Sequence, residues 1–353
     1  MVNTEGWTAS TQDRPSPGNY AIMARKRASF SARLRSLRWR MAVPLLRALS
    51  LIMGGFSRPW LVAFGQALGL LAYLCLPTAR RRTLDHLAAA FPELDASALR
   101  RCARRTFQNL AIVTLEALVL HRWSREEILE CLVNPEEFLS LIEETRSVPG
   151  AVLVSGHLGH WELLAAAYAR LGGRLRVVGR RVEEDRADAL LTALRGASGV
   201  TVLHSDDSPK GLLAALREGI SVGILPDQDV TELDGVFVDF FGLQAYTPTA
   251  PAKLAIAARV ATYLVYLVRE GFHYRLLKEG PIFPEASRGP DAREAETMRL
   301  TRRWSGYLEA AIRRYPDQWV WMHQRWRNTP DRVARRRGAK RPGQGMTASS
   351  AGS

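Results

Sequence analysis

Cysteine is scarce in this sequence, and the few cysteines form no cluster of metal ligands. Cys75, Cys102 and Cys131 lie far apart, so they cannot all pair with one another and they lack the spacing of a zinc site. Such usage favours a reducing compartment and buried thiols. Nothing else in the sequence indicates a metal or a cofactor, and we expect a protein that uses neither.

Acidic residues are outnumbered by basic ones, 35 to 49, which gives the 353 residues a net charge of +14. This excess implies an anionic partner, such as nucleic acid, an anionic membrane or an acidic carrier protein. The standard nucleic-acid-binding motifs are lacking. Binding to nucleic acid would also leave two apolar segments near the N-terminus unexplained, so we expect no nucleic acid among the partners.

The sequence also lacks a recognisable cleavable signal peptide, because no small-residue cleavage site follows a clean apolar core. Two apolar segments, residues 41–56 and 60–76, follow an arginine-rich stretch instead. The second is uncharged over about 17 residues, which is the short limit for a membrane span. A buried core helix, a full span and a hairpin lying in the membrane interface remain open, and membrane association is the interpretation that we favour.

The composition divides the chain into four parts. We expect a disordered basic N-terminus over 1–40, membrane-associating apolar helices over 41–77, one folded domain over 78–328 and a disordered basic tail over 329–353. Apolar residues make up 47% of the chain, which is ample for the core of such a domain.

From Gly150 onward, short apolar runs alternate with helical patterns. This succession predicts an α/β fold in which a largely parallel central sheet is flanked by helices, preceded by the apolar membrane-associating helical region. We expect strands at 151–154, 175–178, 200–203, 221–225, 262–269 and 274–280, and helices at 161–171, 185–197, 208–217, 249–258 and 294–314.

The chain is organised around the segment GAVLVSGHLGHWE, in which an apolar run ends in a small-residue turn. His157 follows the turn, and Glu162 lies five positions later at the start of a helical pattern. A histidine held by a carboxylate can take a proton from a hydroxyl group, so this pair is a candidate catalytic base. The alternatives are a structural histidine and a zinc site, although His157-x-x-His160-x-Glu162 does not have the HExxH spacing.

Polar residues follow the other predicted strands as well. Because sites in open α/β sheets form at the carboxyl ends of strands, these residues are candidates for the same site. Arg180 or Arg181 could bind a phosphate. Asp227 could orient a base or cap a turn, and both possibilities remain open. The full set comprises Arg180, Arg181, His204, Asp206, Asp207, Asp227, Gln228 and Asp229.

Two later aromatic stretches allow two interpretations each. Residues 235–248, GVFVDFFGLQAYTP, form either a buried hairpin or an apolar wall for a long chain. Residues 319–326, WVWMHQRW, pack against the edge of the sheet or lie at a membrane interface. We expect packing for the tryptophans of the second stretch.

Taken in order, these motifs resemble the bacterial lipid A biosynthesis acyltransferases of the lauroyl and myristoyl type, within the lysophospholipid-acyltransferase-like superfamily. The resemblance covers about 41–328 and rests on HLGHWE, Arg180, PDQD, FFG with TPTA, and WVWMHQRW. The upstream phrase RRRTLDHLAAAFPEL is also similar to the helical segment that precedes this motif in the family. One HxxxxE motif would be weak support, whereas the ordered set is specific.

The resemblance implies an acyltransferase on the cytoplasmic face of the inner membrane, with acyl carrier protein as donor and a lipid A precursor as acceptor. In such an enzyme His157 is the general base, Glu162 orients it, and Arg180, Asp227 and Gln228 contribute to substrate binding. A hydroxyl group needs a base to attack a thioester, and a histidine–glutamate pair supplies one without a covalent enzyme intermediate.

The sequence departs from the family pattern at a few positions. His160 stands where the family usually has asparagine, Arg181 where proline commonly follows, and Ala250-Pro251-Ala252 lacks an expected glycine. These departures leave the expected chemistry intact, but they bear on the identity of the acceptor. The alternatives are therefore a coenzyme A-dependent enzyme that acylates another glycolipid, such as a phosphatidylinositol mannoside, and a non-catalytic membrane-bound protein.

Overall fold

The computed structural model describes residues 44–146, 149–179, 185–204, 209–230, 232–286 and 289–339. The predicted site residue Arg180 lies outside the described residues, as do Arg181, Asp206 and Asp207. The same holds for 1–40, where we expected disorder.

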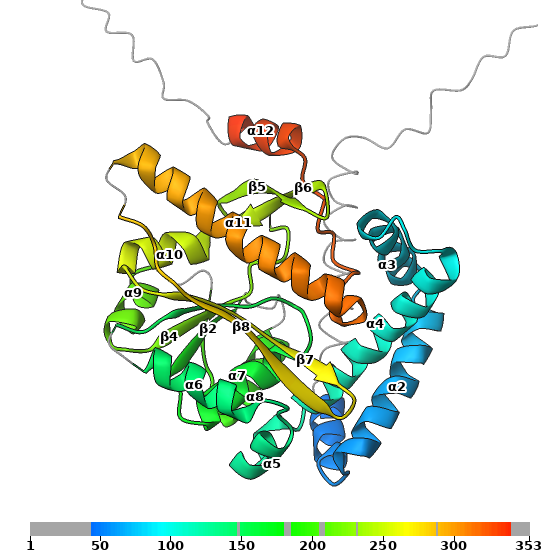
Figure 1. The fold of residues 1–353 in the computed structure, drawn as a ribbon. Coiled ribbons are helices and arrows are strands. Elements are labelled where there is room, and N and C mark those ends of the chain that lie inside the picture. Colours follow the sequence, from blue (N-terminus) through cyan, green and yellow to red (C-terminus); the bar gives the residue numbers. More distant parts are fainter. Residues whose placement is uncertain are drawn as a thin grey trace, which may run out of the picture.

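A six-stranded sheet forms the centre of the fold (Figure 1), with strand order β3-β2-β4-β1-β7-β8. All neighbouring strands are parallel except β7 and β8, which form an antiparallel hairpin at one edge. The prediction of a largely parallel sheet is confirmed, and the predicted strands differ from the observed ones by a few residues at their ends. The strands are β1 Val152–Val154, β2 Leu175–Gly179, β3 Thr201–His204, β4 Ser221–Ile224, β7 Thr262–Glu270 and β8 His273–Ile282.

Residues 235–248 form a separate antiparallel hairpin of β5 (Gly235–Phe240) and β6 (Leu243–Pro248). Phe241 and Gly242 join the strands with φ angles of 59° and 73°, as a two-residue turn with both residues in the left-handed region requires. Phe240 is fully buried against Trp319, with ring centroids 5.7 Å apart. The stretch is therefore a packed hairpin, as the first interpretation of its sequence held.

Helices cover both faces of the sheet (Figure 1). On one face α9, α10 and α11 pack against strand residues such as Val152 and Ile224, and on the other α5, α6 and α7 pack against residues such as Leu153 and Val265. The alternation along each strand therefore supplies two apolar layers. The helices from residue 120 onward are η1 Leu120–Arg122, α5 Arg125–Glu130, α6 Pro135–Thr145, α7 Trp161–Arg170, α8 Asp185–Ala197, α9 Pro209–Arg217, α10 Ala250–Ala258, α11 Pro290–Arg314, η2 Pro316–Gln318 and α12 Pro330–Ala339.

The described part of the chain begins with the helices Pro44–Met53, α2 (Arg58–Cys75), α3 (Pro77–Ala90) and α4 (Ala96–Ala117). Helix α2 lies along α4 at close range. A Cβ atom on Gly69 would lie 2.4 Å from the Cα atom of Gln108, so a side chain there would separate the two helices.

In the described part of the chain, no single helix is long and apolar enough to cross a membrane. Helices α2 and α3 pass that test as a pair, but a bend of 95° separates them. Cys75, at the end of α2, is exposed, whereas Cys131 is buried, so the expectation of buried thiols is wrong for Cys75.

The predicted disordered tail contains helix α12, Pro330–Ala339. Thr329 precedes this helix and accepts a hydrogen bond from the Arg332 backbone N–H at 3.4 Å, while Pro330 occupies the first turn, where its missing N–H costs nothing. These helix-start signals account for the difference from our expectation.

Candidate active site

His157 lies on the turn between β1 and α7, residues 155–160, which we call the catalytic turn because it carries the candidate base. Gly159 has a φ of +64°, and a Cβ atom there would lie 2.1 Å from the carbonyl oxygen of Leu267. The turn is therefore pressed against β7 in a conformation that favours glycine. Its backbone is held by hydrogen bonds from Gly159 N to Gln318 O at 3.0 Å and from His160 N to Leu267 O at 2.7 Å.

Asp227 holds His157 through two contacts. The His157 backbone N–H donates to Oδ2 at 2.7 Å, and Nδ1 lies 2.8 Å from Oδ1. Strands β1 and β4 are parallel neighbours, so the residues that follow them meet at the same edge of the sheet. Of the two possible roles we left open for Asp227, its position beside the imidazole fits the orientation of a base.

Asp227 is itself completely enclosed, with 1% of its surface exposed. The indole N–H of Trp319 donates to Oδ2 at 3.0 Å. Gly156 allows the Asp227 carboxylate to lie close to the turn, because a Cβ atom on residue 156 would lie 3.2 Å from Oδ2 of Asp227. The carboxylate therefore accepts three hydrogen bonds, which fix its orientation and stabilise its charge.

The electrostatics of the pair favour an ionised Asp227 beside His157. Burial disfavours the charged imidazolium, but attraction to the Asp227 carboxylate and its hydrogen bond outweigh burial and raise the pKa of His157. Burial alone would raise the pKa of Asp227, yet the neighbouring His157 and the hydrogen bonds from His157 and Trp319 lower it. Asp227 is therefore a carboxylate near neutral pH and accepts the proton carried by Nδ1.

With its proton on Nδ1, the neutral imidazole presents an unprotonated Nε2. The side chain of His157 is 24% exposed, and the Gln228 amide nitrogen lies 3.4 Å from Nε2. A hydroxyl group of a substrate could approach this atom and replace the long contact with Gln228. The predicted site residues His157, Asp227 and Gln228 therefore lie together.

Glu162 occupies a different position from the one we expected. Among the described residues its carboxylate is bound by Arg195, with Nε 3.0 Å from Oε2 and an outer nitrogen 2.5 Å from Oε1, rather than by His157. Because α7 begins at Trp161, Glu162 is the second helical residue and is directed toward α8. It remains close enough for its charge to contribute to the raised pKa of His157.

Arg195 and Trp319 were not identified as site residues from the sequence. Arg195 lies on α8, and its pairing with Glu162 depends on how α7 and α8 pack, which no local motif reveals. We assigned Trp319 to packing, and it does pack, with 1% exposure, while also donating to Asp227. A buried tryptophan needs a partner for its N–H group, and that requirement was the available signal.

The other polar residues from the predicted set have different surroundings. Asp229 accepts a hydrogen bond from the Asn328 backbone at 2.8 Å, and its own N–H donates to Nε2 of His323 at 2.8 Å. His204 ends β3 at an edge of the sheet, and its Nε2 lies 3.8 Å from Oδ2 of Asp188. Among the described residues, no group of three or more His, Cys, Asp or Glu side chains could hold a metal ion.

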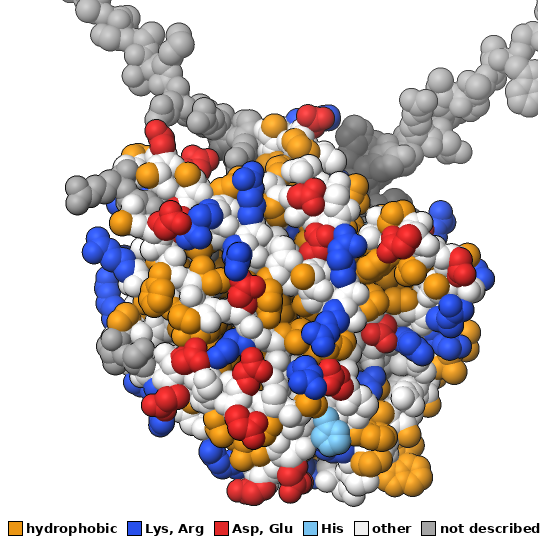
Figure 2. Space-filling model, viewed as in Figure 1, with side chains coloured by type: hydrophobic (Ala, Val, Ile, Leu, Met, Phe, Trp, Pro, Cys, Tyr) orange, Lys and Arg blue, Asp and Glu red, His pale blue; other side chains and the backbone are white. Residues whose placement is uncertain are grey.

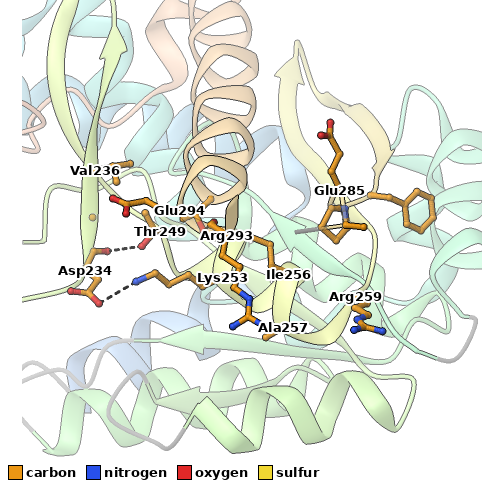
Figure 3. Close-up of a pocket in the computed structure, with 15 residues that line it drawn as sticks. Asp234, Val236, Thr249, Lys253, Ile256, Ala257, Arg259, Glu285, Arg293 and Glu294 are labelled. Atoms are coloured by element: carbon orange, nitrogen blue, oxygen red, sulfur yellow. Dashed lines mark hydrogen bonds and ion pairs between the residues drawn. The ribbon is translucent and has the colours of Figure 1, made fainter. Parts of the chain in front are cut away.

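Two cavities within the described part of the molecule lie in distinct places. The larger, about 1110 Å³, is bordered by α10 and the N-terminal part of α11 (Figure 3), and His157 and Asp227 are not among its lining residues. A second cavity, about 230 Å³, is bordered by Trp161, Glu162 and Arg195 and otherwise mostly by apolar side chains. The Trp161 ring lies 5.0 Å from the His157 ring, so the second cavity begins beside the candidate base.

Comparison with known proteins defines the class of this one. It is 26% identical over 284 residues to the lipid A biosynthesis lauroyltransferase of Escherichia coli, covering 79% of this chain and 89% of that protein. It is 22% identical to the lipid A biosynthesis myristoyltransferase of the same organism, covering 80% and 84%. The protein is an acyltransferase.

The family model described as bacterial lipid A biosynthesis acyltransferase matches residues 27–328, and the chain belongs to that family. A second kind of relative is the phosphatidylinositol mannoside acyltransferase of Mycolicibacterium smegmatis, 25% identical over 181 residues. That match covers 50% of this chain and 57% of the relative. The family implies an acyl donor and a lipid acceptor.

Proposed function

We propose that the protein transfers a fatty acyl chain from acyl carrier protein to a hydroxyl group of a lipid A precursor at the cytoplasmic face of the inner membrane. The observation that carries the proposal is the His157–Asp227 pair, with Nδ1 2.8 Å from the carboxylate and a His157 side chain that is 24% exposed. Family membership supplies the class of reaction.

In the proposed mechanism Nε2 of His157 removes the proton of the acceptor hydroxyl group as its oxygen attacks the thioester carbonyl carbon. Asp227 stabilises the imidazolium that forms and keeps the ring oriented. When the tetrahedral intermediate collapses, the carbon–sulfur bond breaks, and the imidazolium can return its proton to the departing thiolate. No covalent acyl-enzyme is required, because the acceptor oxygen attacks the thioester directly. The thiolate is a good leaving group, so its departure needs little acid assistance.

The Glu162–Arg195 pair lines the smaller cavity. Arg195 is 29% exposed, and its guanidinium group is available to stabilise negative charge that develops on the carbonyl oxygen. Glu162 then acts by holding Arg195 and by adding negative charge near His157. The apolar cavity beside Trp161 is suited to the beginning of the acyl chain. Arg180 retains its proposed role in substrate binding.

Helix α2 supports a location at the membrane surface. After Arg58 it carries no charged residue, and its outward side chains remain exposed: Trp60 is 60% exposed, Leu71 56% and Leu74 59%. Figure 2 shows hydrophobic side chains gathered at the edge of the molecule where α2 lies in Figure 1. Apolar surface of this extent favours insertion into a lipid interface. The exposed basic side chains of the neighbouring α3 and α4 suit anionic lipid, and they include Arg81, Arg100, Arg101, Arg104 and Arg105.

A second candidate function is acyl transfer to another glycolipid from coenzyme A. The similarity to the phosphatidylinositol mannoside acyltransferase of M. smegmatis supports this alternative, because half of the chain aligns with it. The greater coverage of the lauroyltransferase, 89% of that protein against 57%, favours the lipid A precursor.

The experiment that tests the proposal is acyl transfer by detergent-purified protein with two donors and two acceptors. Acyl carrier protein and coenzyme A thioesters are each combined with a partly acylated lipid A precursor and with a phosphatidylinositol mannoside. His157→Ala is compared with His273→Ala, which removes an exposed histidine on β8.

We expect transfer from acyl carrier protein to the lipid A precursor, lost in His157→Ala and kept in His273→Ala. Transfer to the mannoside with no transfer to lipid A would replace the acceptor. A folded wild-type protein that transfers to neither would contradict the proposed reaction and favour a non-catalytic membrane protein.

A further inference from the structure

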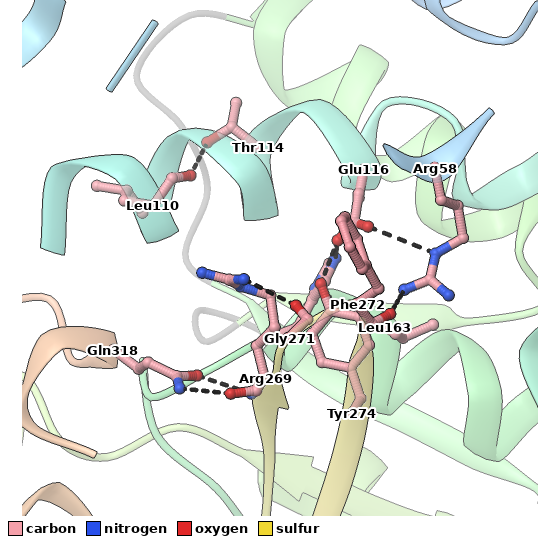
Figure 4. Close-up of polar contacts among 11 residues, drawn as sticks. Arg58, Leu110, Thr114, Glu116, Leu163, Arg269, Gly271, Phe272, Tyr274 and Gln318 are labelled. Carbon is pink, nitrogen blue, oxygen red and sulfur yellow. Dashed lines mark hydrogen bonds and ion pairs between the residues drawn. The ribbon is translucent and has the colours of Figure 1, made fainter. Parts of the chain in front are cut away.

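We propose that Glu116 is a positioning residue for the catalytic turn, because its buried carboxylate connects His160, at the end of the turn, with Arg58, at the start of α2. The proposal rests on the proposed function, since it assigns Glu116 an effect on the activity of His157. Figure 4 shows Glu116 on α4 between Arg58 and Tyr274.

His160 provides the connection to the turn. Its ring is fully buried and lies at the N-terminus of α7, where Nδ1 accepts the Leu163 backbone N–H at 3.1 Å. An Nδ1 that accepts a hydrogen bond carries no proton, so the neutral ring has its proton on Nε2. That Nε2 lies 3.5 Å from Oε2 of Glu116 and makes no hydrogen bond within the described residues. The Nε2–H group of His160 is therefore in electrostatic contact with the Glu116 carboxylate, without a hydrogen bond between them.

Glu116 is held from the opposite side. The Tyr274 hydroxyl donates to Oε2, and Nε of Arg58 lies 3.7 Å from Oε1. Arg58 is fixed in turn by a 2.6 Å hydrogen bond to the Phe272 carbonyl oxygen and by the Trp123 ring, 4.9 Å from its guanidinium carbon. Glu116 itself has no exposed surface. A buried carboxylate is costly without such partners, so the network restricts where each member can lie.

A second set of contacts reaches the same turn from β7. The Gln318 side chain bonds both the N–H and the carbonyl oxygen of Arg269 at 2.8 Å, and the Gln318 backbone oxygen accepts Gly159 N–H at 3.0 Å. The Arg269 side chain contacts Asn109 on α4. Both sets therefore join α4 to the segment that contains His157, one at Gly159 and the other at His160.

The geometry has a consequence for α2. Arg58 is the first residue of the helix whose apolar side chains are exposed, and Glu116 joins it to a residue three positions after the candidate base. A displacement of α2 would therefore be transmitted from Arg58 to the turn that carries His157 through the side chains of Glu116 and His160. The position of α2 on α4 thus contributes to the alignment of the catalytic turn.

The test measures kcat and KM for acyl transfer in Glu116→Leu, with Glu116→Gln as the conservative variant. Loss of the carboxylate releases His160, and misalignment of this kind lowers kcat by about 10–100-fold while KM is unchanged. Glutamine keeps a side-chain oxygen that can face His160 and should retain most of kcat. Glu296→Gln is the matched control, because Glu296 is a buried carboxylate paired with Arg299 on α11, outside the contacts of the turn.

A cycle with His160→Ala, which removes the whole imidazole, distinguishes positioning from a general loss of stability. If Glu116 acts through His160, the double variant with Glu116→Leu has the kcat of the more impaired single variant. The proposal would be overturned if the losses in kcat of the two single variants multiplied in the double variant. It would also be overturned if Glu116→Leu raised only KM, or if its kcat equalled that of Glu296→Gln. If the leucine variant does not fold, Glu116→Asp withdraws the carboxylate while keeping its charge, and kcat should fall in the same direction. An unchanged kcat in the aspartate variant would then overturn it.

Amide hydrogen exchange separates this proposal from the proposed function. In Glu116→Leu, or in Glu116→Asp if the leucine variant does not fold, the segment containing Gly159, His160 and Leu163 should exchange faster than in wild type and in Glu296→Gln. This readout needs no substrate. Absence of acyl transfer by wild type would contradict the proposed function, whereas unchanged exchange in this segment would contradict the role of Glu116.

Discussion

Two histidines of one turn, three residues apart, have opposite properties. His157 is partly exposed, lies 2.8 Å from a carboxylate oxygen, and has a raised pKa because Asp227 outweighs its burial. His160 is fully buried and 3.5 Å from a carboxylate oxygen, and burial lowers its pKa to about 3. The same residue type is therefore suited to proton transfer at one position and remains neutral and structural at the other. Burial and the charges of Arg58 and Arg269 keep His160 neutral, whereas attraction to the Asp227 carboxylate outweighs burial at His157.

The change with the largest expected effect removes the candidate base. His157→Ala should lower kcat by about 10²–10⁴-fold, the range that general base catalysis contributes. The measurement is steady-state acyl transfer from acyl carrier protein with the thermal midpoint recorded in parallel. Activity within a few-fold of wild type in a folded variant would show that His157 is not the base.

Removal of the negative charge that distinguishes the two histidines should have the next largest effect. Asp227→Asn leaves the shape of the side chain but takes away the charge that stabilises the imidazolium, so we expect kcat to fall by about 10²-fold or more. Turnover at saturating substrate provides the comparison with wild type. An equal loss in Asp229→Asn, where the carboxylate bonds Asn328 instead of His157, would point to a structural effect.

A smaller loss is expected when one of the hydrogen bonds to Asp227 is removed. Trp319→Phe retains the aromatic packing but loses the N–H group that donates to Oδ2 at 3.0 Å. A hydrogen bond to a charged group contributes about 1.5–3 kcal/mol. We expect part of this free energy to be lost from the stabilisation of the His157 imidazolium by Asp227, which corresponds to roughly a 10-fold loss in kcat. Trp321→Phe, whose N–H donates to Pro316 O, is the control and should retain activity.

The smallest effect should come from changing His160 to the residue usual in the family. His160→Asn keeps a side-chain oxygen that can accept the Leu163 N–H and an amide N–H that can face Glu116, so we expect less than about 10-fold loss in kcat. His160→Ala loses that cap and should destabilise the fold by about 1 kcal/mol in denaturant unfolding. An asparagine variant as inactive as His157→Ala would erase the distinction between the two histidines.

The sequence identified the fold well, because each apolar run is short and separated by a helical pattern. It also predicted His157, Asp227 and Gln228 as site residues, and these three lie together. It did not reveal that Asp227 rather than Glu162 contacts Nδ1, because the adjacency of β1 and β4 follows from strand order, which local patterns do not encode.

Arg195 and Glu116 were missed for a related reason. Each acts through a residue distant in sequence, Arg195 through Glu162 on α7 and Glu116 through Arg58 and His160. A lone charged residue in an amphipathic helix is ordinarily solvated, so neither position carried a signal. Their roles depend on how helices pack around the turn.

The pH dependence of kcat/KM for acyl transfer in wild type, Asp227→Asn and Glu162→Gln tests the central claim most directly. A base must be unprotonated to act, so wild-type activity should fall as the pH drops below the raised pKa of His157. Without the Asp227 charge, burial outweighs the remaining contribution of Glu162 to that pKa, and the acid limb of Asp227→Asn should move to lower pH. Glu162→Gln should move it less, because its charge contributes less to the raised pKa. An acid limb that moves further in Glu162→Gln than in Asp227→Asn would contradict the account.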